Sequence, residues 1–401
     1  MKIILIIFLL FALPVEAKED LSKIDWQTND SDPPFSAKEA KRGGTWYDHM
    51  STYPLTFRLY GPNSNGSFAG WLRPNCFLGL VERHPNTLNF FPVLATHWAV
   101  MKDQKTVYYK LDPDVRFNDG HPVTSEDYVF AYHMMLSPHL KAPFYKKYYS
   151  EKFGSVETVG PYVVKIVGRY PSWKALSEYQ VNPEPKHATK LDKDWVKRTN
   201  WKKPVCVGPY RVGKTKRGRY VRLERIKDWW GDKKRFLKNR FNFDKINIRV
   251  LRDRQIAFEH FKKGKLNSFQ VGSAARWARK TDFDSIKKNW IVKKKVFVEA
   301  PDGLYGIIMN LNDPLLKDIN LRKALQHLFD FDKINKKLMF SAYVRMTSIF
   351  TGTPYANKKL KPYPLSPDKA QGYLSKSGWR KRGKDGLLIN QDGQRLSLTL
   401  T

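Results

Sequence analysis

The sequence predicts a globular protein of mixed α/β class with two or three domains, and three observations lead to this prediction. About 384 of the 401 residues follow a short N-terminal leader, and one domain usually takes roughly 100–200 residues. Hydrophobic residues make up 41% of the chain and aromatic residues 14%, which is enough for packed cores and too much for a disordered chain. Runs with strand composition alternate with capped helical segments, as in mixed α/β folds.

The leader at 1–17 has the features of a cleavable signal peptide. Lys2 supplies a positive charge, residues 3–13 are all apolar, and Val15-Glu16-Ala17 places small residues where signal peptidase cleaves. The apolar run is too short for a membrane-spanning helix, which needs about 20 residues, and this length argues against the alternative of an uncleaved anchor. No cysteine follows the run, so a lipid-anchored start is not supported. We therefore expect a periplasmic protein.

The first half of the mature chain begins with a polar leader, 18–42, in which we expect little structure. Strand composition marks three later segments: 45–47, 107–111 and 163–167. Thr124, followed by Ser125-Glu126-Asp127 and an apolar run, predicts an N-capped helix. Just before it, Asp119-Gly120 predicts a tight turn. Residues 187–203 are basic and predict surface loops with a short helix.

The second half contains further strand and helix signals. Strands are predicted at 208–212 and 220–223 as a hairpin turning at Gly218, and at 246–250, 269–271, 305–311 and 396–401. Helices are predicted near 256–264, ending at Gly264, on the apolar face formed by Leu321, Ala324, Leu325 and Leu328, and from Ser366 to Gly378.

The chain is strongly basic, with 72 Lys and Arg against 38 Asp and Glu and a formal net charge of +34. Such a charge attracts nucleic acids, anionic lipids and acidic ligands. The lysines are spread along the whole chain, however, and do not gather on one element. Diffuse charge favours a general surface property over a dedicated polyanion site, so we expect no nucleic-acid partner.

Cysteine occurs only at Cys76 and Cys206. Two cysteines make neither a disulfide framework nor a metal knuckle, which needs four ligands at short spacing. In an oxidising compartment the two can form one bridge, and the alternative is a pair of buried thiols that act as small hydrophobes.

Four motifs follow one another along the chain. The first is Leu94-Ala95-Thr96-His97-Trp98 followed by Tyr109-Lys110-Leu111 and the segment 115–127, which contains Phe117-Asn118-Asp119-Gly120-His121-Pro122. The second is Gly208-Pro209-Tyr210 with 225–231, the third is 256–264, and the fourth is Asn310-Leu311-Asn312 with 321–325 and 329–332. Together they resemble the extracellular solute-binding proteins of dipeptide and oligopeptide ABC importers. Asn242-Phe243-Asp244 and the segment 329–332 point to the Yej-type peptide and microcin C binders within that family.

The resemblance implies a two-lobed α/β fold of the type II periplasmic binding proteins (cluster C), with an extra subdomain inserted in lobe I. On this chain it places lobe I at 43–77 and 205–300, the inserted subdomain at 78–204, and lobe II at 301–401. Family members continue further through lobe II and cross back to lobe I. The resemblance therefore implies that lobe II is incomplete here and that the family's acidic partner for a peptide amino terminus lies beyond Thr401.

The same resemblance implies the function of a periplasmic, monomeric protein that captures peptides between its lobes and delivers them to an ABC permease in the inner membrane. Peptide backbones are held by hydrogen bonds, and side chains lie in roomy pockets. Our candidate ligand-binding residues are Asn63, Ser64, Arg276, Trp277, Tyr305, Arg345 and Ser348. For Trp277 and Tyr305 the structural alternative is an ordinary core or rim aromatic, and for Arg345 a surface charge.

Enzyme classes find little support in the sequence, and we expect no catalytic residue, no cofactor and no metal. The chain has no Gly-x-Ser-x-Gly and no His-Glu-x-x-His motif. Asp228 beside two tryptophans suggests a secreted sugar hydrolase, but no second carboxylate joins it. Asp119, Gly120, Thr124, Gly208 and Pro209 have structural explanations as turn and cap residues. The remaining alternative is a secreted polyanion-binding protein, supported only by the net charge.

Overall fold

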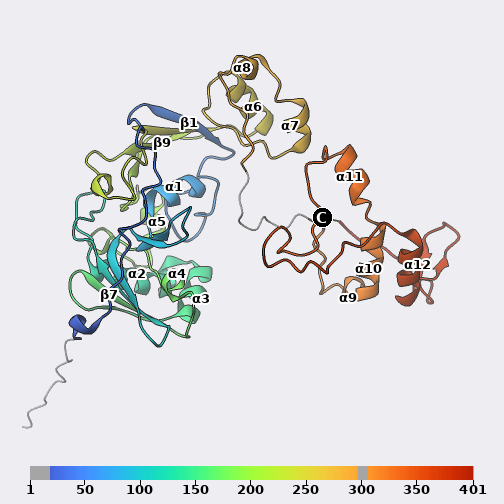
Figure 1. Ribbon diagram of the computed structural model, residues 1–401, viewed down its shortest axis with the longest axis horizontal. Coiled ribbons are helices and arrows are strands. Elements are labelled where there is room, and N and C mark those ends of the chain that lie inside the picture. Colours follow the sequence, from blue (N-terminus) through green and yellow to red (C-terminus); the bar gives the residue numbers. More distant parts are fainter. Residues whose placement is uncertain (1–18, 297–305, 401) are drawn as a thin grey trace, which may run out of the picture. The chain divides into compact units, whose positions relative to one another are not determined.

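The computed structural model describes residues 19–296 and 306–400, and the chain divides into two compact units (Figure 1). The first unit ends at Phe269 and the second begins at Gln270. The predicted signal peptide, 1–17, lies outside the described residues. Within the described ranges, no helix has the length and apolar character that a membrane crossing requires.

One four-stranded sheet of the first unit joins segments that are far apart in the sequence. Its order is β1 (Thr45–Met50), β10 (Lys245–Val250), β9 (Tyr220–Arg225) and β8 (Tyr210–Lys216). β1 runs parallel to β10 and pairs from Thr45 opposite Lys245 to Met50 opposite Val250, whereas the other neighbours are antiparallel. A parallel pair cannot be joined by a tight turn, so the chain between these strands must leave the sheet and return.

Local signals in the sequence account for three of these strands. β8 and β9 form the predicted hairpin, and Gly218 in its turn has a φ of +70°, which a residue without a Cβ adopts easily. In β10, Ile246 and Ile248 are buried while their neighbours are more exposed, which confirms the predicted half-buried strand.

The chain that leaves the first sheet builds a second one. Its strands are antiparallel in the order β4 (Ala95–Val100), β5 (Thr106–Leu111), β7 (Val163–Gly168) and β6 (Phe153–Thr158), beside a ribbon of β2 (Val81–Arg83) and β3 (Phe90–Pro92). In the part of the chain that is described, strands inside 78–204 share no sheet with strands outside it.

Helix α2 (Ser125–Leu136) packs on this second sheet at β6 and β7. The Asp127 carboxylate accepts a hydrogen bond from the backbone N–H of Thr124 at 2.9 Å, which confirms the predicted capped start. The other helices of the first unit are α1 (Ala69–Cys76), α3 (Pro143–Lys152), α4 (Ala175–Glu178), α5 (Trp195–Thr199) and α6 (Arg254–Lys262), with 3-10 turns at Leu21–Lys23, Pro138–Leu140, Lys186–Ala188 and Trp230–Lys233. α6 confirms the helix predicted before Gly264.

The polar leader is held by other segments and has little regular structure of its own. Gln27 forms an isolated antiparallel bridge with Trp98 of β4. Asp32 accepts hydrogen bonds from the Thr87 hydroxyl at 2.6 Å and from the Asn29 amide at 2.8 Å. These contacts fix the leader along the edge of the second sheet.

The second unit is mainly helical and has a small core. Its elements are α7 (Ala274–Arg279), α8 (Asp284–Lys287), α9 (Pro314–Lys317), α10 (Ile319–Leu328), α11 (Phe331–Lys337), α12 (Pro367–Lys376), β11 (Lys381–Arg382) and β12 (Leu388–Ile389). α10 packs on α12, and Leu321, Ala324, Ala370, Leu374 and Trp379 are buried between and beside them. α10 and α12 confirm two predicted helices, although Leu328 is 47% exposed and lies outside the predicted buried face.

Three predicted strands are wrong over the residues that are described. Residues 269–271, 306–311 and 396–400 form no strand. Ile307 is 60% exposed and Ile308 89%, so the central part of the second segment has an apolar composition but no layer to pack against. The third segment meets β12 through the hydrogen bond from the Leu396 N–H to the Leu388 carbonyl, next to an isolated bridge between Arg395 and Ile389. A strand needs a paired neighbour, and composition alone does not supply one.

The structure joins Cys76 and Cys206 in a disulfide, the first of the two arrangements that the sequence left open. Their Cα atoms are 4.9 Å apart, within the usual range for a bridge. Cys76 ends α1 and Cys206 precedes β8, so the bond ties the chain where the second sheet's segment begins to where that segment ends. Gly208 packs against the same point, because a Cβ there would lie 2.1 Å from the Asn75 carbonyl oxygen.

A buried carboxyl lies in the core of the first unit. Glu184 is 6% exposed and its Oε1 atom has no hydrogen-bond partner among the described residues. Burial raises the pKa of this carboxyl to about 8, and the nearby Asp127 carboxylate acts in the same direction. The folded protein therefore holds a proton here that the unfolded chain has already released at neutral pH.

We predict that reduction of the disulfide destabilises the first unit. The bridge closes a loop of 130 residues, and loss of such a constraint typically costs about 2–4 kcal/mol, mainly by freeing the unfolded chain. Urea unfolding with and without reductant, and of the C76A/C206A variant, measures the effect. Identical unfolding midpoints in all three samples would contradict the disulfide.

We also predict that Glu184 makes the stability depend on pH. Because the pKa of Glu184 is near 4.5 when the chain is unfolded and about 8 when it is folded, its contribution to stability is complete below about pH 4.5 and is lost as pH rises to about 8. Glu184→Gln removes this fall and gains a few kcal/mol relative to wild type near pH 8.5. The matched control is Glu151→Gln on the surface of α3. Equal pH dependence of urea unfolding in wild type and Glu184→Gln would refute the assignment.

Candidate functional site

Two of the predicted ligand-binding residues, Asn63 and Ser64, lie in the loop between Tyr60 and α1. Asn63 is exposed and has a φ of +63°, in the left-handed region that asparagine tolerates. Ser64 is buried at 6% exposure, and its hydroxyl donates to the Gly61 carbonyl at 2.8 Å. The loop therefore presents the Asn63 side chain outward, while Ser64 closes the turn.

Two arginines hold this loop in place. The Arg58 guanidinium donates to the Pro62 carbonyl at 2.7 Å and to the Tyr60 carbonyl at 3.2 Å. Arg73 of α1 donates to the Leu59 carbonyl at 2.9 Å and to Asn65 Oδ1 at 2.7 Å. Burial lowers the pKa of Arg58. Charged donors on several carbonyls make strong hydrogen bonds, so the loop is a preorganised surface.

Arg276 and Trp277 lie in α7 of the second unit. Ser273 caps this helix by accepting from the Arg276 N–H at 3.3 Å. The Trp277 ring is half-buried, with the Lys293 ammonium 4.5 Å and the Lys295 ammonium 5.8 Å from its centroid. α7 thus holds an aromatic ring beside two ammonium groups, and these positive charges attract anionic groups.

Arg345 and Ser348 lie in the irregular segment after α11 of the same unit. The Arg345 guanidinium is 5.7 Å from the centre of the Phe331 ring. The Ser348 hydroxyl accepts from the Phe350 N–H at 3.2 Å, so it closes a local turn. α7 reaches this region, because the Arg279 guanidinium lies 4.8 Å from the centre of the Phe340 ring.

The structure therefore places the candidates in three groups: Asn63 with Ser64, Arg276 with Trp277, and Arg345 with Ser348. Tyr305 lies outside the described residues. The exposed or half-buried side chains of Asn63, Trp277 and Arg345 remain candidates for ligand contact. The hydroxyls of Ser64 and Ser348 are instead engaged in the turns that hold their loops.

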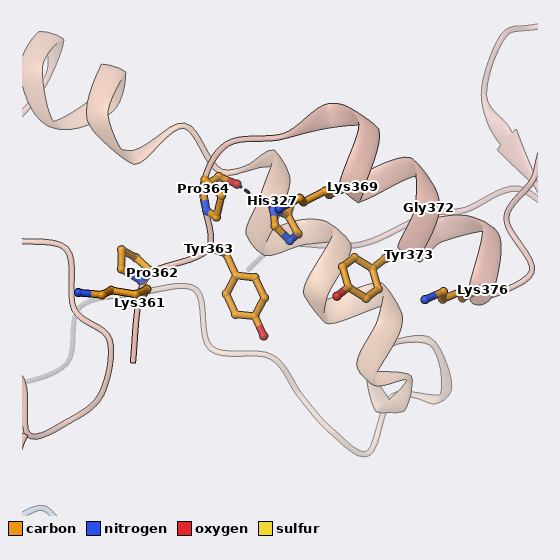
Figure 2. Close-up of a pocket in the computed structure, with 9 residues that line it drawn as sticks. All are labelled: His327, Lys361, Pro362, Tyr363, Pro364, Lys369, Gly372, Tyr373 and Lys376. Carbon is orange, nitrogen blue, oxygen red and sulfur yellow. Dashed lines mark hydrogen bonds between the residues drawn. The ribbon is translucent and has the colours of Figure 1, made fainter. Parts of the chain in front are cut away.

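A cavity of about 550 Å³ lies in the second unit, and none of the predicted residues lines it. It is lined by His327, Lys361, Pro362, Tyr363, Pro364, Lys369, Gly372, Tyr373 and Lys376. Figure 2 shows the His327 ring lying between the rings of Tyr363 and Tyr373, whose centroids are 5.1 and 5.7 Å away. His327 is fixed by a hydrogen bond of 2.8 Å between its Nδ1 atom and the Pro364 carbonyl (Figure 2).

The lining gives this cavity a defined chemistry. Three lysines and the aromatic rings favour a carboxylate or another anionic group carried beside a flat surface. All three lysines are exposed, however, and water screens exposed charges. Each lysine therefore contributes less to affinity than a buried charge would.

A periodic signal in the sequence anticipates part of this cavity. Lys369, Tyr373 and Lys376 are spaced four and three residues apart, which places them on one face of the predicted helix. His327 belongs to α10, and only the packing of α10 on α12 brings it to that face. The sequence therefore predicts the helix face with Tyr373 and its lysines, but not that His327 packs against it.

The tryptophans beside Asp228 do not form a sugar platform. Trp229 is 3% exposed, and the indole N–H groups of Trp229 and Trp230 both donate to the Val207 carbonyl at 2.9 Å. Their role is to fix the segment before β8. Glu184, the other carboxyl with an unusual environment, is buried in the core. It lines neither the cavity at His327 nor a second cavity beside the polar leader at Gln27 and Asn29.

Comparison with known proteins shows which family and which fold this chain matches. The model of a family described as bacterial extracellular solute-binding proteins, family 5 Middle, matches residues 89–401. A solved structure of the oligopeptide-binding protein AppA from Bacillus subtilis, in complex with a nonapeptide, superposes with a TM-score of 0.64 and covers 89% of this chain and 68% of that one. At 22% sequence identity this likeness shows the fold alone, and it confirms the predicted two-lobed α/β binding-protein class.

Two relatives extend the match at the level of sequence. A putative binding protein of Brucella suis is 29% identical over 277 residues, which are 68% of this chain and 44% of that protein. The probable peptide-binding protein YejA of Agrobacterium fabrum is 26% identical over 280 residues, 67% of this chain and 45% of that protein. The match thus covers less than half the length of each relative, and the predicted Yej-type resemblance is confirmed.

The matched family region includes the turn at Asp119-Gly120, the capped helix α2, strands β8 to β10 and all of the described second unit. These are the elements in which the sequence motifs lie. Since the family model covers well over half of the 401 residues, the chain belongs to the bacterial extracellular solute-binding proteins of family 5.

Proposed function

We propose that the chain is the periplasmic solute-binding component of an ABC importer, and that it captures oligopeptides or peptide-like compounds and hands them to a membrane permease. The observation that carries the proposal is membership of the solute-binding family, together with the match to a probable peptide-binding relative over two thirds of the chain. In this function the protein binds as a monomer and makes or breaks no bond.

The chemistry of the exposed candidates supports a peptide ligand. An extended peptide presents amide groups, flat side chains and a carboxylate. Asn63 supplies an amide, Trp277 an aromatic face, and Arg345 a charged donor, all on segments tied by local hydrogen bonds. Such preorganised polar and aromatic groups hold a ligand at a lower entropic cost than mobile ones.

We predict that a library of short peptides raises the thermal unfolding temperature of the 401-residue chain in a saturable way. A ligand that binds only the folded state adds about 2.7 kcal/mol of stability at a concentration of 100 times Kd. Thermal-shift screening followed by calorimetry measures this. Saturable stabilisation by sugars or heparin that persists at high salt, with none by peptides, would contradict the proposal, because diffuse attraction to the basic surface is screened by salt.

We further predict that Trp277→Ala weakens the binding of the best peptide by about tenfold or more, which is the loss expected when a central aromatic anchor is removed. Trp290→Ala is the matched control, since Trp290 is 75% exposed in the same unit. Calorimetric Kd values of the two variants and wild type decide the point. Equal affinity in all three proteins would remove Trp277 from the ligand site.

A further inference from the structure

A cluster of three metal-ligating side chains lies in the first unit, away from the candidate ligand residues. Asp119 and His121 flank Gly120 in the tight turn before α2. This turn is closed by the hydrogen bond from the Gly120 N–H to the Phe117 carbonyl and by the one from the Phe117 N–H to the His121 carbonyl, both 2.9 Å long. The backbone therefore fixes the positions from which the two side chains extend.

The third member, His187, comes from a distant part of the chain. It lies in the 3-10 turn Lys186–Ala188, whose Lys186 N–H donates to Asp127 Oδ1 at 3.1 Å. The His187 ring packs against Phe117 with ring centroids 5.5 Å apart. The start of α2 and the turn before it thus hold His187 opposite Asp119.

The three side chains converge on one point. His187 Nε2 is 2.7 Å from Asp119 Oδ2, and His121 Nδ1 is 3.5 Å from Asp119 Oδ1. The two imidazole rings are stacked, with centroids 3.8 Å apart. One ligand atom from each residue lies within 4.8 Å of the others. The exposed fractions of the side chains, 27% for His187, 32% for Asp119 and 58% for His121, leave room for an ion and its water molecules.

We propose that Asp119, His121 and His187 bind one divalent transition-metal ion, with water completing its coordination. Two imidazole nitrogens and one carboxylate oxygen are a ligand set that Zn²⁺ and Cu²⁺ favour, with bonds of about 2.0–2.2 Å. The three ligand atoms lie within 4.8 Å of one another, and a change in the side-chain torsions of the exposed His121 is needed to bring all three onto one ion. The sequence alone does not indicate this site, because His187 lies 66 residues after His121.

The surrounding charges permit a cation here in spite of the basic chain. The Lys186 ammonium is paired with the Glu126 carboxylate at 2.7 Å, and the Asp127 carboxylate lies beside the His187 turn. A bound metal takes the place of the 2.7 Å contact between His187 Nε2 and Asp119 Oδ2. The bound ion clamps the turn before α2 to the segment at 187.

The test is calorimetric titration of the chelator-treated 401-residue chain with Zn²⁺ at pH 7.5. We expect one site whose affinity falls at least about tenfold in His121→Ala and in His187→Ala, as loss of one ligand requires. His139→Ala, an exposed histidine of the same unit, is the matched control and keeps wild-type affinity. Electron paramagnetic resonance of the Cu²⁺-loaded protein should show coupling to two imidazole nitrogens, reduced to one in His121→Ala.

Unchanged affinity in His121→Ala, or an equal loss in the His139→Ala control, would overturn the proposal and leave the cluster as a hydrogen-bonded tether. Because His187 is partly buried, His187→Ala can lose its fold, and far-ultraviolet circular dichroism of each metal-free variant checks this. His121 is the most exposed of the three and carries the test alone if His187→Ala does not fold.

Discussion

The parallel pairing of β1 with β10 is the constraint on which the first unit depends. It sets Thr45 beside Lys245, so everything between them must leave one sheet and come back to it. The returning chain is fixed where it re-enters by the Cys76–Cys206 bond, by Gly208 against the Asn75 carbonyl, and by two indoles on the Val207 carbonyl. With both ends anchored, residues 78–204 build a second sheet whose buried side chains join those of the first sheet in one hydrophobic core. The loop that carries Asn63 lies in the chain between β1, which is paired with β10, and α1, which ends at the disulfide.

Local chemistry made much of this fold predictable. The cap at Thr124, the turn at Gly218 and the helix end at Gly264 depend on neighbouring residues only, and the structure has all three. The strand predicted at 305–311 failed over its described part because strand composition does not provide a pairing partner. The polar leader has little regular structure of its own, as predicted, but its bridge from Gln27 to Trp98 joins distant segments and is a contact that no local pattern encodes.

The candidate site also combines features that the local sequence predicts with features that depend on packing between distant segments. Exposure of Asn63 follows from the turn formers around it, whereas helix α7, which carries Trp277, was not among the predicted helices. That the Ser64 and Ser348 hydroxyls close their own turns depends on where the neighbouring backbone comes to lie, which the sequence does not reveal. The cavity at His327 and the cluster at His187 each need two segments brought together by packing. Spacing rules find ligands that share one element, and both of these sites combine two.

The family to which the chain belongs is a family of solute-binding proteins, and this is the basis of the proposed function. The central claim is that the chain holds intact peptides reversibly. Native mass spectrometry of the purified chain mixed with a defined set of peptides tests it most directly. We predict one-to-one complexes whose peptides leave on mild activation with their masses unchanged. Complexes that yield shortened peptides, or a spectrum without any complex in the presence of excess peptides, would contradict the claim.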